Sequence, residues 1–267
     1  MKIILSRKGF DSASGKQPNP IMPDGTLLSL PIPSEKDDRV TTYSSLSWNG
    51  RSYYDIIHSL KPKSKIMAND FCHLDPDIRK DVCSRPSEWK PAFGQVDSAL
   101  THLRNQQVSI GDIFLFFGWF KATEERNGTL VYKKGAPDLH IIYGYMQIGV
   151  IINKEKDVPQ WLMKHPHASY RNAWNKNLNA IFLPSDKLSV LPNKKGCDTL
   201  DYRENRVLTM PNMPKGRWNL PQFFRNAPIS YHPNPWRSNY FQSAGRGQEF
   251  VMEATPEVLT WAKQIIE

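Results

Sequence analysis

We expect the fold to be organised around residues Val108–Phe120, which read Val-Ser-Ile-Gly-Asp-Ile-Phe-Leu-Phe-Phe-Gly-Trp-Phe. It contains the turn pair Gly111-Asp112, and the run after this pair, Ile113–Phe117, is continuously apolar and aromatic. Such a run is typical of a strand that is buried on both faces. The sequence therefore predicts a central strand here, against which the rest of the chain packs.

A second long strand is expected beyond a hairpin turn. Asn127-Gly128 lies at the centre of the polar segment that follows the first strand, and this pair favours a tight hairpin. The second strand, Ile141–Ile152, contains Gly144 and Gly149, and glycine inside a strand usually marks a bulge or a barrel corner. We therefore predict an α+β fold with a curled mixed or antiparallel sheet, or a small barrel, with packed helices.

The flanking segments predict elements that pack on this centre. Lys2–Ser6 is typical of a short first strand, and apolar residues at helical spacing predict a helix over about Gln95–Gln107. Thr255-Pro256 is typical of a helix start that leads into a closing amphipathic helix. We predict a single compact domain over residues 1–267, with a barrel-like core at about 108–185 and the N- and C-terminal elements packed on it.

The charge of the chain indicates a class of partner. The chain has 35 lysines and arginines against 26 aspartates and glutamates, a net charge of +9. This balance favours polyanions, nucleic acid first and an anionic membrane surface second. No apolar run approaches the ~20 residues that span a bilayer. Three cysteines without paired spacing predict reduced thiols and a cytoplasmic setting.

The loop after the first strand is the first segment with chemical content. It supplies the cations Arg7 and Lys8, the carboxylate of Asp11 and the hydroxyl of Ser14, with glycines between them. Glycine lets the backbone approach a ligand, and N–H groups with cations complement a phosphate. The spacing matches neither a Walker motif nor a dinucleotide fingerprint, so a polar turn in which Asp11 caps local N–H groups is the alternative.

A second segment, Phe71–Asp77, places His73 beside two aspartates. Asp75 followed by Pro76 is typical of a helix start, with Asp75 as the N-cap. His73 is then either a hydrogen-bonded polar residue or a site residue just before that helix. Its spacing from other ligands fits no familiar zinc pattern.

A further histidine pair flanks a proline in His165-Pro166-His167. Because proline disfavours helical backbone before it, we expect an extended dipeptide whose two rings point apart. We therefore predict no bound metal and no cofactor.

Near the C-terminus, Arg246 lies between glycines and precedes Gln248 and Glu249. Arginine can fork onto a phosphate, and an amide or a carboxylate can contact a base edge or a sugar. The alternative is a bulged last strand in which Arg246 pairs with Glu249.

Several segments together resemble the third nucleotide-modification-associated domain family, over almost the whole chain. They are Ser6–Ser12, Pro23–Thr26, Pro31–Pro33, Val108–Phe120 and Gly247–Val251. The resemblance implies the company of systems that modify bases in the DNA of bacteria and phages. It implies DNA or a nucleotide as partner, together with other proteins of such a system, and no membrane. It does not imply a settled reaction or a catalytic set.

The middle of the chain is also similar to the small barrels of the PUA-like class, on Gly111–Phe117 and Ile142–Gly149. Those domains bind RNA or modified DNA bases, in some cases by flipping the base into a pocket. This similarity implies Trp119, Tyr143 and Tyr145 as candidate aromatic contacts.

Two functions from different classes follow. The first is a module that binds modified DNA bases or nucleotides. The second is an enzyme acting on a nucleotide or a DNA base, with Asp11 or Glu249 as the acid/base group and His73 assisting. One enclosed pocket shared by these three residues favours the enzyme, whereas an open basic groove beside Trp119 or Trp236 favours the binder. A scaffold within a modification system is a third possibility without positive support in the sequence.

Overall fold

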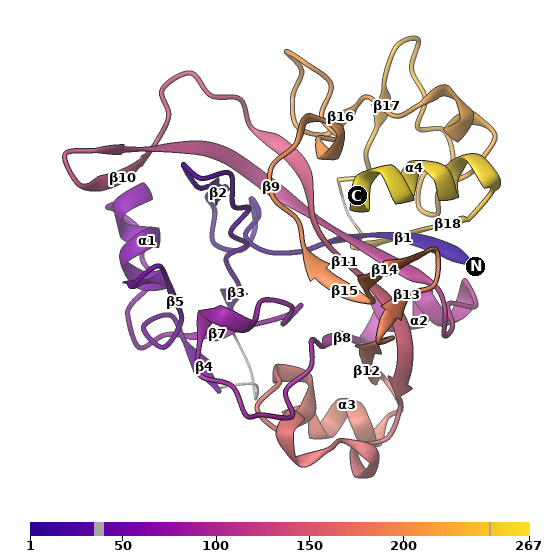
Figure 1. Ribbon diagram of the computed structural model, residues 1–267, viewed down its shortest axis with the longest axis horizontal. Coiled ribbons are helices and arrows are strands. Elements are labelled where there is room, and N and C mark those ends of the chain that lie inside the picture. The colour runs from indigo at the N-terminus through magenta and orange to yellow at the C-terminus, as the bar shows by residue number, and fades with distance from the viewer. Residues whose placement is uncertain (35–39, 246) are drawn as a thin grey trace.

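The computed structural model describes residues 1–34, 40–245 and 247–267. The protein is organised around a nine-stranded mixed sheet that curls strongly into a half-barrel (Figure 1). Its strands are β1 (Lys2–Arg7), β2 (Asn19–Ile21), β8 (Phe93–Val96), β9 (Ile113–Arg126), β10 (Thr129–Tyr132), β11 (Leu139–Ile152), β12 (Asn179–Pro184), β15 (Cys197–Thr199) and β18 (Glu249–Glu253). The main path runs β18-β1-β9-β11-β12-β8, while β2 and β10 also pair with β9, and β15 pairs with β11. The prediction of a curled α+β fold is confirmed.

The two long strands β9 and β11 are antiparallel neighbours at the centre of this sheet. A tight turn at Asn127 and Gly128, both with positive φ, joins β9 to β10, as the sequence predicts. The register of β11 shifts between Ile142 and Gly144 against β9, and between Ile148 and Val150 against β12. The predicted glycine bulges are therefore confirmed, and they help the sheet to curl.

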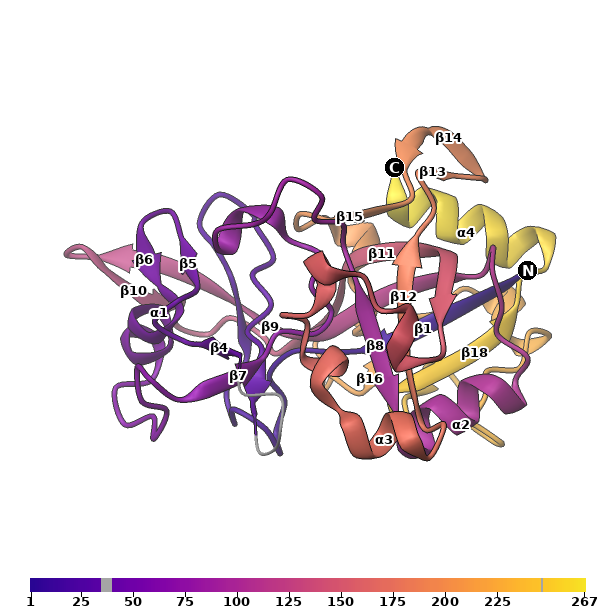
Figure 2. The ribbon, with the colours of Figure 1, turned by 90° about the horizontal axis from the view of Figure 1, so that it is seen from below.

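The two ends of the chain meet in the same sheet. Strand β1 lies between β9, to which it is parallel, and β18, to which it is antiparallel. Thus Ile4 has Phe114 on one side and Val251 on the other. Figure 2 shows β1 and β18 running side by side at the end of the molecule opposite β10. The loop that follows β1 therefore lies near the segment that precedes β18.

In the described part of the chain, four α-helices pack around the sheet: α1 (Tyr53–Leu60), α2 (Asp97–Asn105), α3 (Arg171–Asn175) and α4 (Pro256–Ile266). Helices α1 and α4 lie at opposite ends of the molecule, α1 beside β10 and α4 against β1 (Figure 1). The side chain of Thr255 accepts a hydrogen bond from the Val258 N–H, so the predicted cap is confirmed. The predicted second helix begins at Asp97 rather than Gln95, because the residues before it form β8 and pair with β12.

Short elements complete the fold. A three-stranded sheet has the order β3 (Ile32–Pro33), β7 (Phe71–His73) and β4 (Thr41–Thr42). The two-stranded pairs are β5 (Ser47–Trp48) with β6 (Arg51–Ser52), β13 (Lys187–Leu188) with β14 (Leu191–Lys195), and β16 (Arg217–Trp218) with β17 (Phe241–Gln242). The 3₁₀ turns are η1 (Lys80–Val82), η2 (Glu155–Asp157), η3 (Gln160–Leu162), η4 (Pro166–Ser169), η5 (Glu204–Arg206) and η6 (Gln222–Arg225).

The central strand is buried on both faces, as predicted. Its side chains alternate, so Leu115 and Phe117 enter an apolar cluster that includes the inner face of α4. Phe114 and Phe116 enter a second cluster, which includes Leu100 of α2. Burial of these side chains from water on both faces is the main force that holds the sheet between its helices. Among the described residues, no helix has the length and apolar character needed to cross a membrane.

Candidate functional site

A cleft of about 540 Å³ brings together most of the residues that the sequence singles out. Its walls come from the loop after β1, the end of β7, strand β8, the η4–α3 segment and the residues before β18. The predicted site residues that line it are Arg7, Lys8, Asp11, Ser14, His73, Asp75 and Gln248. This volume lies in the range of small-molecule sites. The cleft therefore unites the N-terminal loop with the histidine segment.

The cleft opens where the two edge strands of the curled sheet approach each other. Strand β8 is one end of the sheet path and β18 is the other. A hydrogen bond from the amide of Gln95 to the Glu249 carboxylate joins them. We call this contact the seam. Side chains, rather than the backbone ladder, thus connect the two edges beside the cleft.

At one end of the cleft, Arg7 supplies a positive charge. Its guanidinium donates to the carbonyl oxygens of Ala244 and Gly245, at 2.5 and 3.1 Å, and lies over the rings of Phe117 and Phe250. Among the described residues, no carboxylate oxygen lies within 4.0 Å of this guanidinium. Arg7 is therefore held in place without a partner of opposite charge.

Asp11 serves the loop in which it lies. Its Oδ1 accepts hydrogen bonds from the N–H groups of Ala13 and Ser14, at 2.7 and 2.6 Å. The local turn that the sequence offers as the alternative is thus formed, on the wall of the cleft. Gly9 has φ +78°, and a Cβ there would meet the Ser29 hydroxyl at 2.5 Å, so only glycine fits this loop.

Glu249 lies behind the cleft wall rather than on it. The residue is 1% exposed, and its Oε1 accepts from the Ser6 hydroxyl and the Lys8 ammonium, both at 3.0 Å, as well as from Gln95. The ammonium of Lys8 also lies 4.6 Å from the centre of the Phe93 ring. Glu249 therefore anchors Lys8 and the seam. The alternative partner named for it, Arg246, lies outside the described residues.

Two predicted aromatic contacts lie elsewhere. The indole N–H of Trp119 donates to Asp138 at 2.9 Å, and the Lys215 ammonium lies 4.2 Å from the centre of its ring. Tyr145 is 2% exposed within the core, and its hydroxyl donates to the Lys195 carbonyl oxygen at 3.1 Å. Neither residue lines the cleft.

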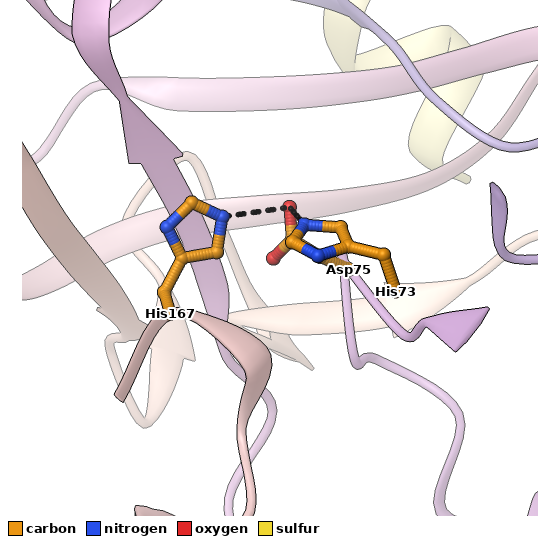
Figure 3. Close-up of side chains that lie close together, drawn as sticks. All are labelled: His73, Asp75 and His167. Atoms are coloured by element: carbon orange, nitrogen blue, oxygen red, sulfur yellow. Dashed lines mark ion pairs between the residues drawn. The ribbon is translucent and has the colours of Figure 1, made fainter. Parts of the chain in front are cut away.

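At the other end of the cleft, histidines surround Asp75. Its Oδ2 lies 4.0 Å from Nε2 of His73 and 3.9 Å from Nε2 of His167, and its Oδ1 lies 3.3 Å from Nε2 of His165. Figure 3 shows the carboxylate between the rings of His73 and His167. We call these four residues the histidine–aspartate cluster. His73, Asp75 and His167 offer three possible ligand atoms within 4.8 Å of one another.

Two sequence interpretations of these residues are wrong. No helix begins at Asp75, because its Oδ1 accepts the N–H of Gly94 on β8, at 2.7 Å, rather than an N–H of the following turn. The rings of His165 and His167 do not point apart. Pro166 begins the 3₁₀ turn η4 with His165 as its N-cap, so the chain bends there and both rings face Asp75.

Gly94 makes the cluster possible. A Cβ at this position would lie 2.1 Å from the His167 ring, so the ring packs directly on the backbone of β8. Asn179 lies on the neighbouring strand β12. Its amide oxygen accepts a hydrogen bond from Nδ1 of His167 at 2.9 Å, and its amide nitrogen donates to the His167 carbonyl oxygen at 2.7 Å. The strand pair β8–β12 thus fixes both the carboxylate and one ring.

Burial determines the charge of the cluster. Desolvation lowers the pKa of His167 to about 3, so its imidazole is neutral at pH 7. Burial alone would raise the pKa of Asp75, but the close approach of His165, together with His167 and His73, holds it below its usual value. The carboxylate is therefore ionised. A carboxylate that faces the neutral imidazole of His167 can exchange a proton with a ligand or bind a cation together with that ring.

Sequence reasoning missed Gly94, His167 and Tyr170 as wall residues of the cleft. The pair around Pro166 was visible as a motif, but nothing local indicates that it meets His73. Tyr170 lies close to both rings, with its centroid 6.0 Å from His73 and 5.0 Å from His167. These contacts depend on strand pairing that the sequence alone does not define.

Fold and site together define an α+β protein whose curled sheet carries a histidine–carboxylate cluster in a cleft with one cationic end. The chain matches the family model of nucleotide modification associated domain 3 over residues 2–253, and it belongs to this family. Neither a curated protein nor a solved structure matches the chain significantly. The similarity to PUA-like barrels thus stays a prediction. The family name indicates an association with nucleotide modification.

Proposed function

We propose that the protein binds a nucleotide in this cleft, either free or as one unit of DNA, and acts on it at the histidine–aspartate cluster. The observation that carries the proposal is convergence. Arg7, which has no carboxylate oxygen within 4.0 Å among the described residues, and a buried histidine–carboxylate group line the same cleft of about 540 Å³. A nucleotide has a phosphate for the first and a base or sugar for the second.

Arg7 is the proposed phosphate contact. Its guanidinium is anchored to two carbonyl oxygens, which leave its positive charge for an incoming anion. Arginine binds phosphate through charge-assisted, often bidentate hydrogen bonds. Ser14 and Gln248 also line this end of the cleft and have neutral groups that can donate to phosphate oxygens.

An acting site is favoured over a simple binding surface. Asp11 and His73 line one cleft, and Glu249 lies directly behind its wall. Because Asp11 closes a turn and Glu249 binds Lys8, we assign the chemistry to the histidine–aspartate cluster instead. The surroundings of Asp75 and His167 lower the pKa of each, and groups with pKa values away from the ordinary ones are typical of such sites.

The second candidate is a module that recognises modified bases in DNA. The net charge of +9 favours it, because cations attract the DNA backbone. The positions of Trp119 and Trp236, the tryptophans expected beside a DNA-binding groove, argue against this candidate. Trp119 has Lys215 over its ring, Trp236 has Arg225 over its ring at 4.5 Å, and neither tryptophan lines the cleft.

The test is a binding titration with nucleoside monophosphates that carry ordinary and modified bases, and with DNA duplexes of the same bases, at two salt concentrations. We expect saturable nucleotide binding that Arg7→Gln weakens by about 10-fold or more, since it loses a charge-assisted contact. Arg225→Gln is the matched control, because Arg225 also bonds to carbonyl oxygens and lies over an aromatic ring, outside the cleft.

Unchanged nucleotide affinity in a folded Arg7→Gln protein contradicts the proposal. Steep salt dependence with strong preference for modified duplex, and no nucleotide binding, favours the DNA module instead. If Arg7→Gln does not fold, Ser14→Ala tests the same end of the cleft with a smaller expected loss.

A further inference from the structure

We propose that His73, Asp75 and His167 bind a divalent transition-metal ion at the wall of the cleft. The donor set is two imidazole nitrogens and one carboxylate oxygen, contributed by β7, the segment after it and η4. Imidazole with carboxylate suits first-row ions such as Zn²⁺, Fe²⁺, Co²⁺ and Mn²⁺. The proposal does not depend on which nucleotide the cleft takes.

The hydrogen bonds of Asn179 define the tautomer of His167. The amide nitrogen of Asn179 donates to the His167 carbonyl oxygen at 2.7 Å, which turns the amide oxygen toward Nδ1 of the same ring. Nδ1 must therefore carry the proton that this oxygen accepts, at 2.9 Å. Nε2 then has a lone pair, and it faces Asp75. Metal-bound histidines are commonly oriented by such a bond from the second ring nitrogen.

Asp75 is oriented in a matching way. Its Oδ1 accepts the Gly94 N–H at 2.7 Å and lies 3.3 Å from Nε2 of His165. The N–H of His167 donates to Nδ1 of His165 at 3.3 Å. Oδ1 of Asp75 is thus held by the Gly94 N–H, and the other oxygen, Oδ2, faces the rings of His73 and His167.

The distances suit an ion better than a shared proton. Oδ2 lies 3.9 Å from Nε2 of His167 and 4.0 Å from Nε2 of His73, whereas a hydrogen bond between such atoms spans about 2.7–3.2 Å. Two ligand atoms on one tetrahedral ion, each at about 2.1 Å from it, lie about 3.4 Å apart. The two distances from Oδ2 to the imidazole nitrogens must therefore each shorten by about half an ångström to reach this value. Small rotations of the rings are enough for such a change.

A lone pair and an anion that face each other across such a gap repel unless a cation lies between them. A cation in this space replaces the repulsion by two attractive contacts, one with the carboxylate and one with the lone pair. Three protein ligands leave at least one coordination position open, as in catalytic rather than structural sites. His73, Asp75 and His167 all line the cleft, so the open position faces the bound ligand.

The test is metal binding by the purified full-length protein after removal of ions with a chelator, without any nucleotide. We expect one equivalent of Co²⁺ with a visible absorption band typical of nitrogen and oxygen ligands, displaced by one equivalent of Zn²⁺. His167→Gln and Asp75→Asn should each abolish the band. Asn179→Ala should weaken Zn²⁺ binding about 10- to 100-fold, because it removes the bond that orients the ring.

His140→Gln is the matched control, since it changes a buried histidine outside the cluster and should leave metal affinity unchanged. Circular dichroism tests whether each variant is folded. If a variant of a buried residue does not fold, His73→Ala replaces it, because His73 is only half-buried. The absence of stoichiometric binding, or binding that survives in folded Asp75→Asn and His73→Ala proteins, overturns the proposal. Nucleotide titration in the presence of chelator tests the proposed function separately.

Discussion

His167 and His140 lie in different parts of the molecule and look alike by burial. Each is at most 6% exposed, and burial lowers the pKa of each to about 3. They differ in what they face. Nδ1 of His140 accepts the indole N–H of Trp218 at 3.0 Å within the core, whereas Nε2 of His167 faces the Asp75 carboxylate on the cleft wall.

The same contrast separates two buried carboxylates. Oε1 of Glu249 receives donors from Ser6, Lys8 and Gln95, and its Oε2 is buried without a hydrogen bond from the described residues. Asp75 uses one oxygen for the Gly94 N–H and turns the other toward the rings. Burial is therefore common to structural and candidate functional carboxylates. The position of the second oxygen distinguishes them, because Asp75 lines the cleft and Glu249 does not.

Breaking the structural carboxylate should have the largest effect on stability. Glu249→Ala leaves the Lys8 ammonium, whose side chain is 8% exposed, without its partner, and we expect a loss of about 3–5 kcal/mol. Denaturant unfolding measures it. The double change Lys8→Met/Glu249→Ala should recover part of the loss, because no unpaired charge remains. A single-variant cost below about 1 kcal/mol would show that the pair does not hold the seam.

Gly94→Ala should break the cluster while leaving the His140 side of the molecule intact. The new Cβ meets the His167 ring at 2.1 Å, and overpacking of this kind costs about 1–3 kcal/mol. The ring must also move away from Asp75, so Zn²⁺ binding should weaken about 10-fold or more. Gly245→Ala is the control, since Gly245 lines the same cleft but a Cβ there meets nothing within 4 Å. Equal behaviour of the two variants would contradict the role given to Gly94.

The charge state of His140 predicts a loss of stability in acid. Its folded pKa of about 3 lies below the ordinary value of 6.5, through burial first and then the cations Arg7 and Lys215. The unfolded chain therefore binds more protons between these two values. The contribution of neutral His140 to the free energy of unfolding is fully present above pH 6.5. It falls as the pH drops toward 3, and at pH 5 about 2 kcal/mol of it is lost.

The free energy of unfolding is measured at pH 7 and pH 5 for the wild type and for His140→Gln. Subtracting the change in the variant from the change in the wild type cancels the contributions of other groups. Glutamine keeps an acceptor for Trp218 and does not titrate. The acid slope should be shallower in the variant. Identical slopes in the two proteins would mean that His140 does not remain neutral in the folded state.

The smallest effect on binding is expected for a change in the core beside His140. Trp218→Phe removes the indole N–H, leaves Nδ1 of His140 unsatisfied and reduces the volume of a fully buried ring, at a cost of about 1–3 kcal/mol in stability. Thermal unfolding measures the loss, and metal and nucleotide binding should not change. A changed metal affinity would show that the two histidine regions are coupled and not independent.

Local patterns in the sequence predict much of the fold. The apolar run of β9, the Asn127-Gly128 turn and the Thr255 cap depend on neighbours within a few positions, and each is found as predicted. The N-terminal loop also reaches the cleft, because it directly follows β1. These features need no knowledge of which strands pair.

The cluster could not be predicted, because it depends on pairing between distant strands. β8 and β12 meet in the sheet, and only then do Gly94 and Asn179 bring Asp75 and His167 together. The proline rule holds for the backbone of His165, which is extended, but it did not predict the ring directions. The turn that begins at Pro166 determines where both rings point.

The pairing of β1 with both β9 and β18 has a consequence for synthesis of the chain. Strand β1 cannot complete its hydrogen bonds until the segment Glu249–Glu253 has been made, because β18 is its partner along Lys2–Ser6. Contacts between such distant segments slow folding, since a long loop must close first. A ribosome-bound chain that has not yet exposed β18 therefore has an unpaired edge on β1 and no anchor for Lys8. The cleft should appear only once β18 has paired with β1, which makes ligand binding a report of completed folding.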